Sequence, residues 1–362
     1  CGKDGIKRGG VLCNIYYPRL KKPFEGDSRL ILENAIKQLK EEIGENVDFF
    51  VGIELEFALL KEEGGKLEFY GKGRYFSPPP VDYGYEIREA LRTALEKIGA
   101  RISKNHHEVP PAKHEINIEY EQAIRMADLV IISKLLTKML AAEKQLIATF
   151  MPKPFFGSYG VGMHTHMSIM NTETGENLFY DSSKRDLSDM ALYFIGGILR
   201  HAKALAAITN PSVNSYKRLV PGWEAPVYLS WSLYNRSALI RIPSSPPQAI
   251  HLEYRPTDGS CNPYLALAAI LRAGLDGISN KIHPPAPIDE NIYELNPQER
   301  RKRGIDNLPS NLGEALEELE KDIVVKDAIT PIYDKYIDIK WREWHEYNIM
   351  VHDWEREKYV DV

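Results

Sequence analysis

The spacing of apolar residues along the chain predicts several long helices. Leu30, Ile31, Ala35, Ile36 and Leu39 recur at helical spacing, which predicts a helix over 29–42 that Asp27 or Ser28 can cap. The same spacing predicts helices over 85–98, 121–148 and 186–209. After residue 262 the pattern is mostly helical and ends in an amphipathic helix over 331–349.

Alternating apolar and polar residues predict short strands between these helices. The alternation covers 11–17, 49–60, 114–120, 163–170, 228–242 and 251–254, and Gly64-Gly65 predicts a hairpin turn after the second of these segments. Clean β-α-β units are rare in this pattern. We therefore expect an α+β fold with one antiparallel or mixed sheet backed by helices.

Residue parity places chemically active side chains on one face of four of these strands, because every second residue of a strand faces the same side. These positions are Glu54 and Glu56; Glu115, Asn117 and Glu119; His164, His166 and Ser168; and His251, Glu253 and Arg255. For a single strand, an ordinary solvated polar face is the simpler interpretation. Four such strands together favour a shared cleft.

Glutamates that converge on one cleft repel each other unless cations neutralise them. Carboxylates with an imidazole suit Mg²⁺ or Mn²⁺ better than a structural zinc site, which prefers Cys and His. Divalent ions with nearby arginines indicate phosphoryl chemistry. The sequence has no G-x-x-x-x-G-K-[ST] and no G-x-G-x-x-G after a strand, so we expect a nucleotide to bind in the sheet cleft instead.

Composition and charge exclude several classes of protein. The 362 residues carry 46 Lys+Arg and 51 Asp+Glu, so the net charge of -5 gives no strong attraction to nucleic acid or to an anionic membrane. The apolar stretch 126–151 is interrupted by Lys134, Lys138, Glu143 and Lys144, which predicts a soluble helix. The three cysteines show no pairing pattern, so we expect a cytoplasmic protein. Because the chain begins with Cys and not Met, we expect that something upstream is missing.

Six blocks of sequence resemble the class I glutamine synthetases, in the order and with the spacing of that family. They are Gly52–Phe57 (GIELEF), His106–Val109 (HHEV), Phe150–Pro154 with Gly162–His164, Asn210–Gly222 (NPSVNSYKRLVPG), Asn235–Ser237 (NRS) and Cys261–Ala266 (CNPYLA). The resemblance runs from about residue 11 to 359.

The resemblance implies a glutamine synthetase-type catalytic domain over 21–362, after an N-terminal remnant and linker over 1–20. In that family a curved antiparallel sheet lines a funnel, which ATP enters at one end and glutamate at the other. By this resemblance we expect that the family's usual N-terminal β-grasp domain is missing from the sequence, either because the chain is a fragment or because the ammonium pocket is built differently. The resemblance also implies a homo-oligomeric ring, a dodecamer, and Trp341, Trp344 and Tyr347 could offer apolar surface to a partner or pack within the monomer.

The resemblance assigns a role to particular residues. Two or more Mg²⁺ or Mn²⁺ ions would be held by Glu56, Glu108 and Glu115 at the first site and by Glu54, His164 and Glu253 at the second. Gly160, Arg218 and Arg255 match substrate-binding positions, and His166 and Ser168 match nucleotide-binding positions. Glu224, Arg236 and Arg241 match catalytic positions. Because Arg236 and Arg241 differ in parity, a bend or bulge must separate them.

The implied reaction joins ammonia to the γ-carboxylate of L-glutamate with ATP, through a γ-glutamyl phosphate. Four departures from the family pattern leave alternatives open: Tyr159 replaces an Asn, Lys113 a Gln, His251 an Arg and Trp223 a Tyr. Relatives that use other amines also lose the loop Asn, so a γ-glutamyl-amine ligase is an alternative. A catalytically silent paralogue is another. Tyr293 is expected to be a surface tyrosine on a loop.

Overall fold

A mixed sheet of nine strands forms the centre of the computed structural model, which describes residues 9–223 and 225–362. Its main order is β3-β4-β1-β6-β11-β10-β9, with β2 and β5 also paired to β1. The pairs are antiparallel except for β9 with β10. The strands are β1 (Val47–Glu63), β2 (Lys66–Phe69), β3 (Ile102–His107), β4 (Lys113–Gln122), β5 (Ile147–Thr149), β6 (Met163–Asn171), β9 (Tyr228–Leu233), β10 (Ala238–Ile242) and β11 (Leu252–Tyr254). The α+β prediction with one mixed sheet is confirmed.

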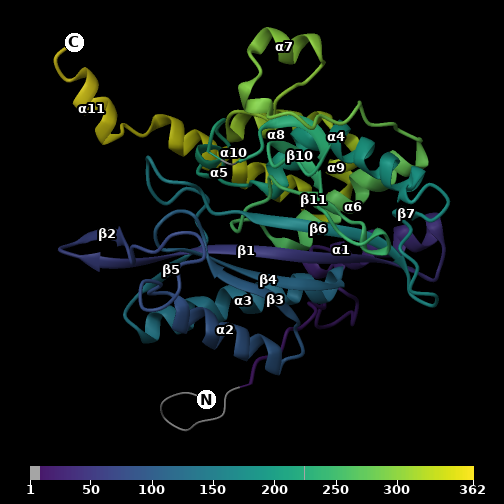
Figure 1. The fold of residues 1–362 in the computed structure, drawn as a ribbon, viewed down its shortest axis with the longest axis horizontal. Helices are drawn as coiled ribbons and strands as arrows, with labels where there is room; N and C mark the ends of the chain where they lie inside the picture. The colour runs from purple at the N-terminus through teal and green to yellow at the C-terminus, as the bar shows by residue number, and fades with distance from the viewer. Residues whose placement is uncertain (1–8, 224) are drawn as a thin grey trace.

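Helices lie on both sides of the long central strand β1 in Figure 1, with α2 and α3 beside β3 and β4 and with α4, α6 and α8 beyond β6 and β11. A short hairpin of β7 (Tyr180–Asp181) and β8 (Asp186–Leu187) precedes α4. The helices are α1 (Ser28–Ile43), α2 (Tyr85–Lys97), α3 (Ala123–Glu143), α4 (Asp189–Thr209), α5 (Ser215–Arg218), α6 (Pro263–Ser279), α7 (Pro297–Lys302), α8 (Leu312–Lys321), α9 (Ile323–Ala328), α10 (Tyr333–Ile349) and α11 (Asp353–Tyr359).

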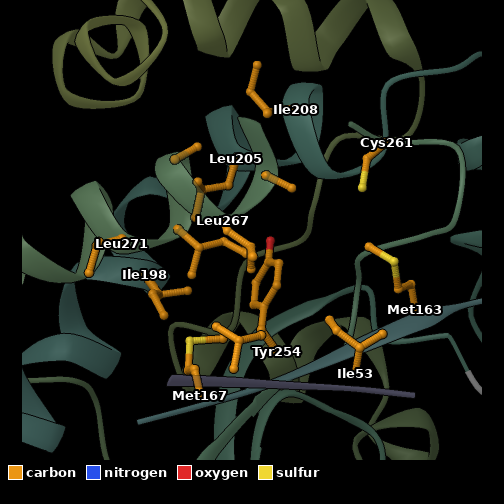
Figure 2. Close-up of a cluster of buried hydrophobic side chains, with 14 of the residues drawn as sticks. Ile53, Met163, Met167, Ile198, Leu205, Ile208, Tyr254, Cys261, Leu267 and Leu271 are labelled. Carbon is orange, nitrogen blue, oxygen red and sulfur yellow. The ribbon is translucent and has the colours of Figure 1, made fainter. Parts of the chain in front are cut away.

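The apolar strand faces and the helices share one core. In Figure 2 the ring of Tyr254 lies between Met167 of the sheet and the side chains of Leu205 and Leu267 from α4 and α6. Helix α4 is long and apolar enough to cross a membrane, but 72% of its most apolar window is buried inside the protein. This burial is typical of a core helix.

Most of the predicted elements are confirmed, including the Asp27 cap, which accepts a hydrogen bond from the backbone N–H of Arg29. The predicted strand 11–17 is wrong, because this segment is largely exposed and makes only an isolated bridge between Tyr16 and Pro23. The part of the predicted linker over 1–8 lies outside the described residues.

Two further boundaries differ from the prediction. The helix predicted to reach 148 ends at Glu143, because Gln145 adopts a left-handed φ of 59° and residues 147–149 turn back to pair with β1. The strand predicted over 228–242 is two strands, separated by a turn that includes Tyr234 at a φ of 79°.

The aromatic residues of α10 pack at least partly within the chain. Trp344 covers Gly313 of α8, where an added Cβ would lie 2.4 Å from the indole nitrogen. The indole N–H of Trp341 donates to Glu320 at 3.0 Å. These contacts favour the packing alternative for both tryptophans, and the homo-oligomeric ring stays a prediction.

Candidate active site

The polar faces of β1, β4 and β6, together with His251 and Arg255 on either side of β11, line a cleft of about 930 Å³. Strand register brings the carboxylates and imidazoles together, because side chains of directly opposite residues lie on the same face. Glu54 is paired with His164 and with Asn117, Glu56 with Glu115, and His166 with Glu253. The apolar partners in the same strands, such as Leu55 and Ile116, are fully buried on the other face. The parity prediction is confirmed.

The first group of candidate metal ligands consists of Glu54, His166 and Glu253, whose ligand atoms all lie within 4.8 Å of one another. His166 Nε2 is 3.2 Å from Glu54 Oε1. Burial opposes ionisation of Glu54, but the hydrogen bond from His166 and the nearby imidazole charges lower its pKa.

Glu253 is fully buried and forms ion pairs with both Arg255 and Arg241. Burial would raise the pKa of Glu253, but the charges of Arg255, the two cleft histidines and Arg241 lower it well below its usual range. Glu253 is therefore a fixed negative charge that holds two guanidinium groups at the cleft.

The second group consists of His106, Glu108 and Glu115. His106 Nε2 is 3.4 Å from Glu115, and His106 Nδ1 is 3.6 Å from Glu108. Burial raises the pKa of Glu115 to about 7, with the neighbouring carboxylate charges adding to the effect, and burial also raises the pKa of Glu108. The positive charge near Glu108 and Glu115 is therefore too weak to offset the effect of burial on their pKa values.

Glu56 lies beside the second group but is engaged by the protein itself. Its Oε2 is 2.7 Å from Lys113 Nζ and also accepts the backbone N–H of Gly162. Its other oxygen is 3.7 Å from His164 Nε2. Burial, followed by the charge of Arg255, lowers the pKa of His164 to about 4, so this imidazole is neutral near pH 7.

Both groups fit a hard divalent cation by the chemistry of their donors, which are carboxylate oxygens with one imidazole each. His106 Nδ1 and His166 Nδ1 are buried and have no hydrogen-bond partner among the described residues. The geometry groups His166, and not His164, with Glu54 and Glu253, and it adds His106 to Glu108 and Glu115. The ligand sets implied by the resemblance stay predictions.

A third group, Asp82, His107 and His114, lies on the opposite face of β4 and is closed by Arg88. The Arg88 guanidinium donates to both oxygens of Asp82, at 3.0 and 2.6 Å, and is 2.8 Å from His114 Nδ1. Burial and the Arg88 charge lower the pKa of His114 well below its usual value. The Asp82 carboxylate in this group is therefore already neutralised by the Arg88 guanidinium.

Arg218 is buried beneath two glycines at the wall of the cleft. A Cβ on Gly160 would lie 2.5 Å from Arg218 Cγ, and a Cβ on Gly162 would lie 2.6 Å from an Arg218 guanidinium nitrogen. The guanidinium donates to the backbone carbonyls of Pro256 and Arg255. At Gly160 the backbone carbonyl oxygen of Pro152 would also lie 2.7 Å from the added Cβ, so only glycine leaves room there.

Arg236 and Arg241 both line the cleft. Arg236 lies in the turn before β10, and Arg241 lies within β10, whose register against β9 shifts between Ala238 and Ile240. The bend or bulge that was predicted between Arg236 and Arg241 is therefore confirmed. His166 and Ser168 line the same cleft.

An aromatic pair stands at one end of the cleft. Tyr159 and Trp223 meet edge to face with ring centroids 5.6 Å apart, and Lys153 Nζ lies 4.4 Å above the Trp223 ring. Tyr293 also lines the cleft, and its hydroxyl donates to the Ala225 carbonyl, so the expected surface position is wrong. Glu224 lies outside the described residues.

Sequence reasoning did not assign a role to His106 or to the charge of Lys113. His106 has the same parity as Glu108, and Lys113 has the same parity as Glu115, so both signals were present. Segment 102–107 lacks clean apolar alternation, and its pairing with β4 is what reveals its faces.

Comparison with known proteins gives a consistent result. The family model described as glutamine synthetase, catalytic domain, matches residues 25–359. The chain is 48% identical to a glutamine synthetase from Thermotoga maritima, over 99% of this chain and 81% of that protein. It is 45% identical to one from Methanocaldococcus jannaschii, over 97% of this chain and 77% of that protein.

Solved structures agree with the fold. A complex of GmaS with ADP superposes with a TM-score of 0.86 at 31% identity, over 96% of this chain and 80% of that one. GmaS without ligand gives a TM-score of 0.83 over the same shares of both chains.

Proposed function

We propose that this chain, which belongs to the glutamine synthetase family through its catalytic domain, ligates ammonia to the γ-carboxylate of L-glutamate with ATP. Its similarity to glutamine synthetases over most of its length supports a glutamate–ammonia ligase, which is a carbon–nitrogen ligase. The observation that carries the proposal is the cleft, where carboxylates and arginines from separate strands meet.

The first step of the proposed reaction activates a poor acyl donor. The γ-carboxylate oxygen attacks the γ-phosphorus of ATP, the bond to the bridging oxygen breaks, and ADP leaves from the resulting γ-glutamyl phosphate. Arg241 is held by Glu253, and Arg236 lines the same wall, so both can stabilise the transferred phosphoryl group.

In the second step ammonia attacks the activated carbonyl and displaces phosphate. We assign glutamate binding to the end of the cleft with Gly160, Arg218 and Arg255, and nucleotide binding to His166 and Ser168. Glu224 would help to deprotonate ammonium, by family resemblance.

Divalent ions would neutralise the phosphate and carboxylate charges during transfer. The family uses ATP and divalent metal ions, and we propose Mg²⁺ or Mn²⁺ for this chain. The Glu54 group would hold the ion nearer the nucleotide, and Glu108 with Glu115 would hold the ion nearer glutamate.

Ligation of glutamate to another amine is the second candidate, and Tyr159 is the observation that favours it. The Tyr159–Trp223 pair offers an apolar wall at the cleft, where a small alkyl group could pack. Two of the similar solved structures are of GmaS, a γ-glutamylmethylamide synthetase.

An ADP-release assay with glutamate, ATP and Mg²⁺ separates these candidates. We expect ammonium to support turnover, and methylammonium, ethylammonium and putrescine to add little. Turnover with an amine but not with ammonium would replace the first candidate by the second. Absence of glutamate-dependent ADP release with every nucleophile would leave the silent paralogue.

We also propose a cytoplasmic homo-oligomer. The composition and the free thiols of the two described cysteines, Cys13 and Cys261, fit a reducing compartment. The C-terminal segment exposes Met350, Val351 and Trp354, which could be covered by a second copy.

A further inference from the structure

His201 of α4 lies in a buried junction between helices, outside the cleft. The residue is only 6% exposed. Two carboxylates contact its ring: Asp276 comes from α6, and Asp322 is the residue that separates α8 from α9. None of these three residues lines the cleft. We call the three residues the His201 junction.

Each ring nitrogen of His201 faces its own carboxylate oxygen. Nδ1 lies 2.6 Å from Asp322 Oδ2, and Nε2 lies 3.0 Å from Asp276 Oδ2. An ionised carboxylate only accepts hydrogen bonds, so each contact needs an N–H on the ring. Neutral imidazole has one N–H and imidazolium has two. The geometry therefore fits imidazolium, because a neutral ring would turn a lone pair toward one of the two carboxylates.

The second oxygen of each aspartate also accepts a hydrogen bond. Asp322 Oδ1 accepts the backbone N–H of Val325 at 3.0 Å, and Asp276 Oδ1 accepts a side-chain N–H of Asn280 at 2.9 Å. Donors at both oxygens favour the ionised form of a carboxylate. The junction therefore contains two negative charges, and the imidazolium of His201 compensates them in part.

The nearby lysines bind other carboxylates. Lys203 of α4 pairs with Asp306 at 2.6 Å, and Lys321 at the end of α8 pairs with Glu318 at 3.0 Å. Within residues 9–223 and 225–362, His201 is the one basic side chain that forms an ion pair with either aspartate of the junction. Its proton is therefore the positive charge on which the junction depends.

Asp322 also connects two helices. Its backbone N–H donates to the carbonyl of Glu318 in the last turn of α8 at 3.1 Å, and its side chain caps the N-terminus of α9. Helix α9 has only six residues, and a helix this short depends on its tertiary contacts. The contact between His201 and Asp322 therefore attaches the α8–α9 connection to the buried helix α4.

We propose that the His201 junction is a proton-dependent connection: as imidazolium, His201 joins α4 to α6 and to the α8–α9 connection, and loss of its second proton as pH rises weakens this joint.

The direction of the pH dependence follows from the pKa of His201. Burial opposes a charge on the ring, but the hydrogen bonds and charges of Asp322 and Asp276 raise this pKa above its ordinary value of 6.5. The stability that the junction contributes is therefore complete below pH 6.5, and it is lost as pH rises through the pKa of the folded chain.

Urea unfolding of the unmodified chain and of Asp276→Asn, in EDTA from about pH 6 to about pH 9, tests this inference. Asp276→Asn keeps the shape of the side chain but removes one charge, so the folded variant holds the His201 proton less tightly. The unmodified chain should be the more stable of the two at pH 6, and its advantage should shrink as pH rises. A difference in unfolding free energy that stays constant, or grows, as pH rises would overturn the inference.

Asp306→Asn is the matched control, because Asp306 also pairs with a residue of α4, but with Lys203 and not with a histidine. Its difference from the unmodified chain should stay constant over this range, since carboxyl and ammonium groups ordinarily titrate outside it. A pH dependence equal to that of Asp276→Asn would overturn the inference, because the effect would then not need His201.

The protonation of His201 can also be measured in the unmodified chain. Exchange of the imidazole C2 hydrogen for deuterium, followed by mass spectrometry as a function of pH, reports on single histidines. The midpoint for His201 should lie above pH 6.5, and it should fall in Asp276→Asn. A midpoint at or below pH 6.5 in the unmodified chain would overturn the inference even if Asp276→Asn does not fold.

Discussion

His114 and Glu115 are neighbours on β4, yet they belong to buried charged clusters of different character on the two faces of the sheet. The back cluster consists of Asp82, Arg88, His107 and His114, and the cleft cluster consists of Glu54, Glu56, Glu108, Glu115 and Glu253. In the back cluster Arg88 satisfies both oxygens of Asp82 and contacts His114. Its charges are compensated by the protein alone.

The cleft cluster has more carboxylates than cations that contact them. Lys113 forms an ion pair with Glu56, and two arginines form ion pairs with Glu253. Among the described residues, the His106 imidazole is the only basic side chain that contacts Glu108 and Glu115, and the Lys113 charge acts on Glu108 from further away. Burial favours the neutral form of both residues, so it lowers the pKa of His114 and raises that of Glu115. The neighbouring charges that add to these shifts differ: they are positive around His114 and negative around Glu115. A buried cluster whose charges are complete stabilises the fold, whereas an incomplete cluster indicates a site that needs an external cation.

The largest effect on stability is expected in the back cluster. Arg88→Met leaves Asp82 buried without its partner and should lower the free energy of unfolding by about 3–5 kcal/mol. Urea unfolding in EDTA measures this change. Arg92→Met is the control, because Arg92 lies one turn further along α2 in half-exposed ion pairs and should change stability by about 1 kcal/mol or less. Similar losses from both variants would contradict the role of the back cluster.

In the cleft cluster the corresponding change should affect activity and spare stability. Glu115→Gln removes one of several repelling carboxylates, so the melting temperature in EDTA should hold or rise. Ligase activity should fall by about 10²–10³-fold, since a group that stabilises charge in the transition state is lost.

Glu121→Gln provides the control for that variant. Glu121 lies on β4 too, but it is paired with Arg125 outside the cleft, and the change should leave activity within about twofold. Near-normal metal-dependent turnover by Glu115→Gln would remove Glu115 from the ligand set.

The pH dependence of stability in metal-free protein sharpens the comparison. The pKa of Glu115 is raised to about 7 from 4.5, so between these values the folded chain holds a proton that the unfolded chain releases. Stability contributed by this group therefore falls as pH rises through this range. The pKa of His114 is lowered, so its contribution falls in the opposite direction, as pH drops below about 6.5.

Urea unfolding of the unmodified chain and of Glu115→Gln, in EDTA from about pH 5 to about pH 8, isolates the Glu115 contribution. The difference in unfolding free energy should shift in favour of the variant as pH rises. A difference that does not change with pH would show that Glu115 ionises normally.

The smallest expected effect concerns the glutamate end of the cleft. Tyr159→Asn restores an amide beside the substrate and should lower the KM for glutamate by a factor that corresponds to about 0.5–1.5 kcal/mol. Ammonium use should not change. An unchanged KM for glutamate would mean that Tyr159 does not contact the substrate.

Local patterns predicted most of the elements and the faces of the strands. The alternation at 53–57 and at 163–169 separated buried from cleft-facing residues correctly, because burial imposes a period of two on any strand with one apolar face. The register was not predictable, since it depends on pairing between segments far apart in the chain, such as Glu56 with Glu115.

The incorrect predictions also concern features that depend on pairing between segments far apart in the chain. Segment 11–17 alternates like a strand, but within residues 9–223 and 225–362 no strand pairs with it. Residues 147–149 form a strand because β1 offers them an edge. The regrouping of His164 and His166 also depends on register, because Gly52 faces His166 and leaves its imidazole free to reach Glu54 and Glu253. Tertiary pairing overrode local pattern in each case.

Transfer of ¹⁸O tests the activation of the glutamate carboxylate most directly. Glutamate labelled in both γ-carboxylate oxygens is incubated with ATP, Mg²⁺ and ammonium, and the phosphate released is analysed by mass spectrometry. If the cleft forms a γ-glutamyl phosphate, one labelled oxygen should appear in the phosphate for each ADP formed. Phosphate without label, released in step with ADP, would contradict the proposed function.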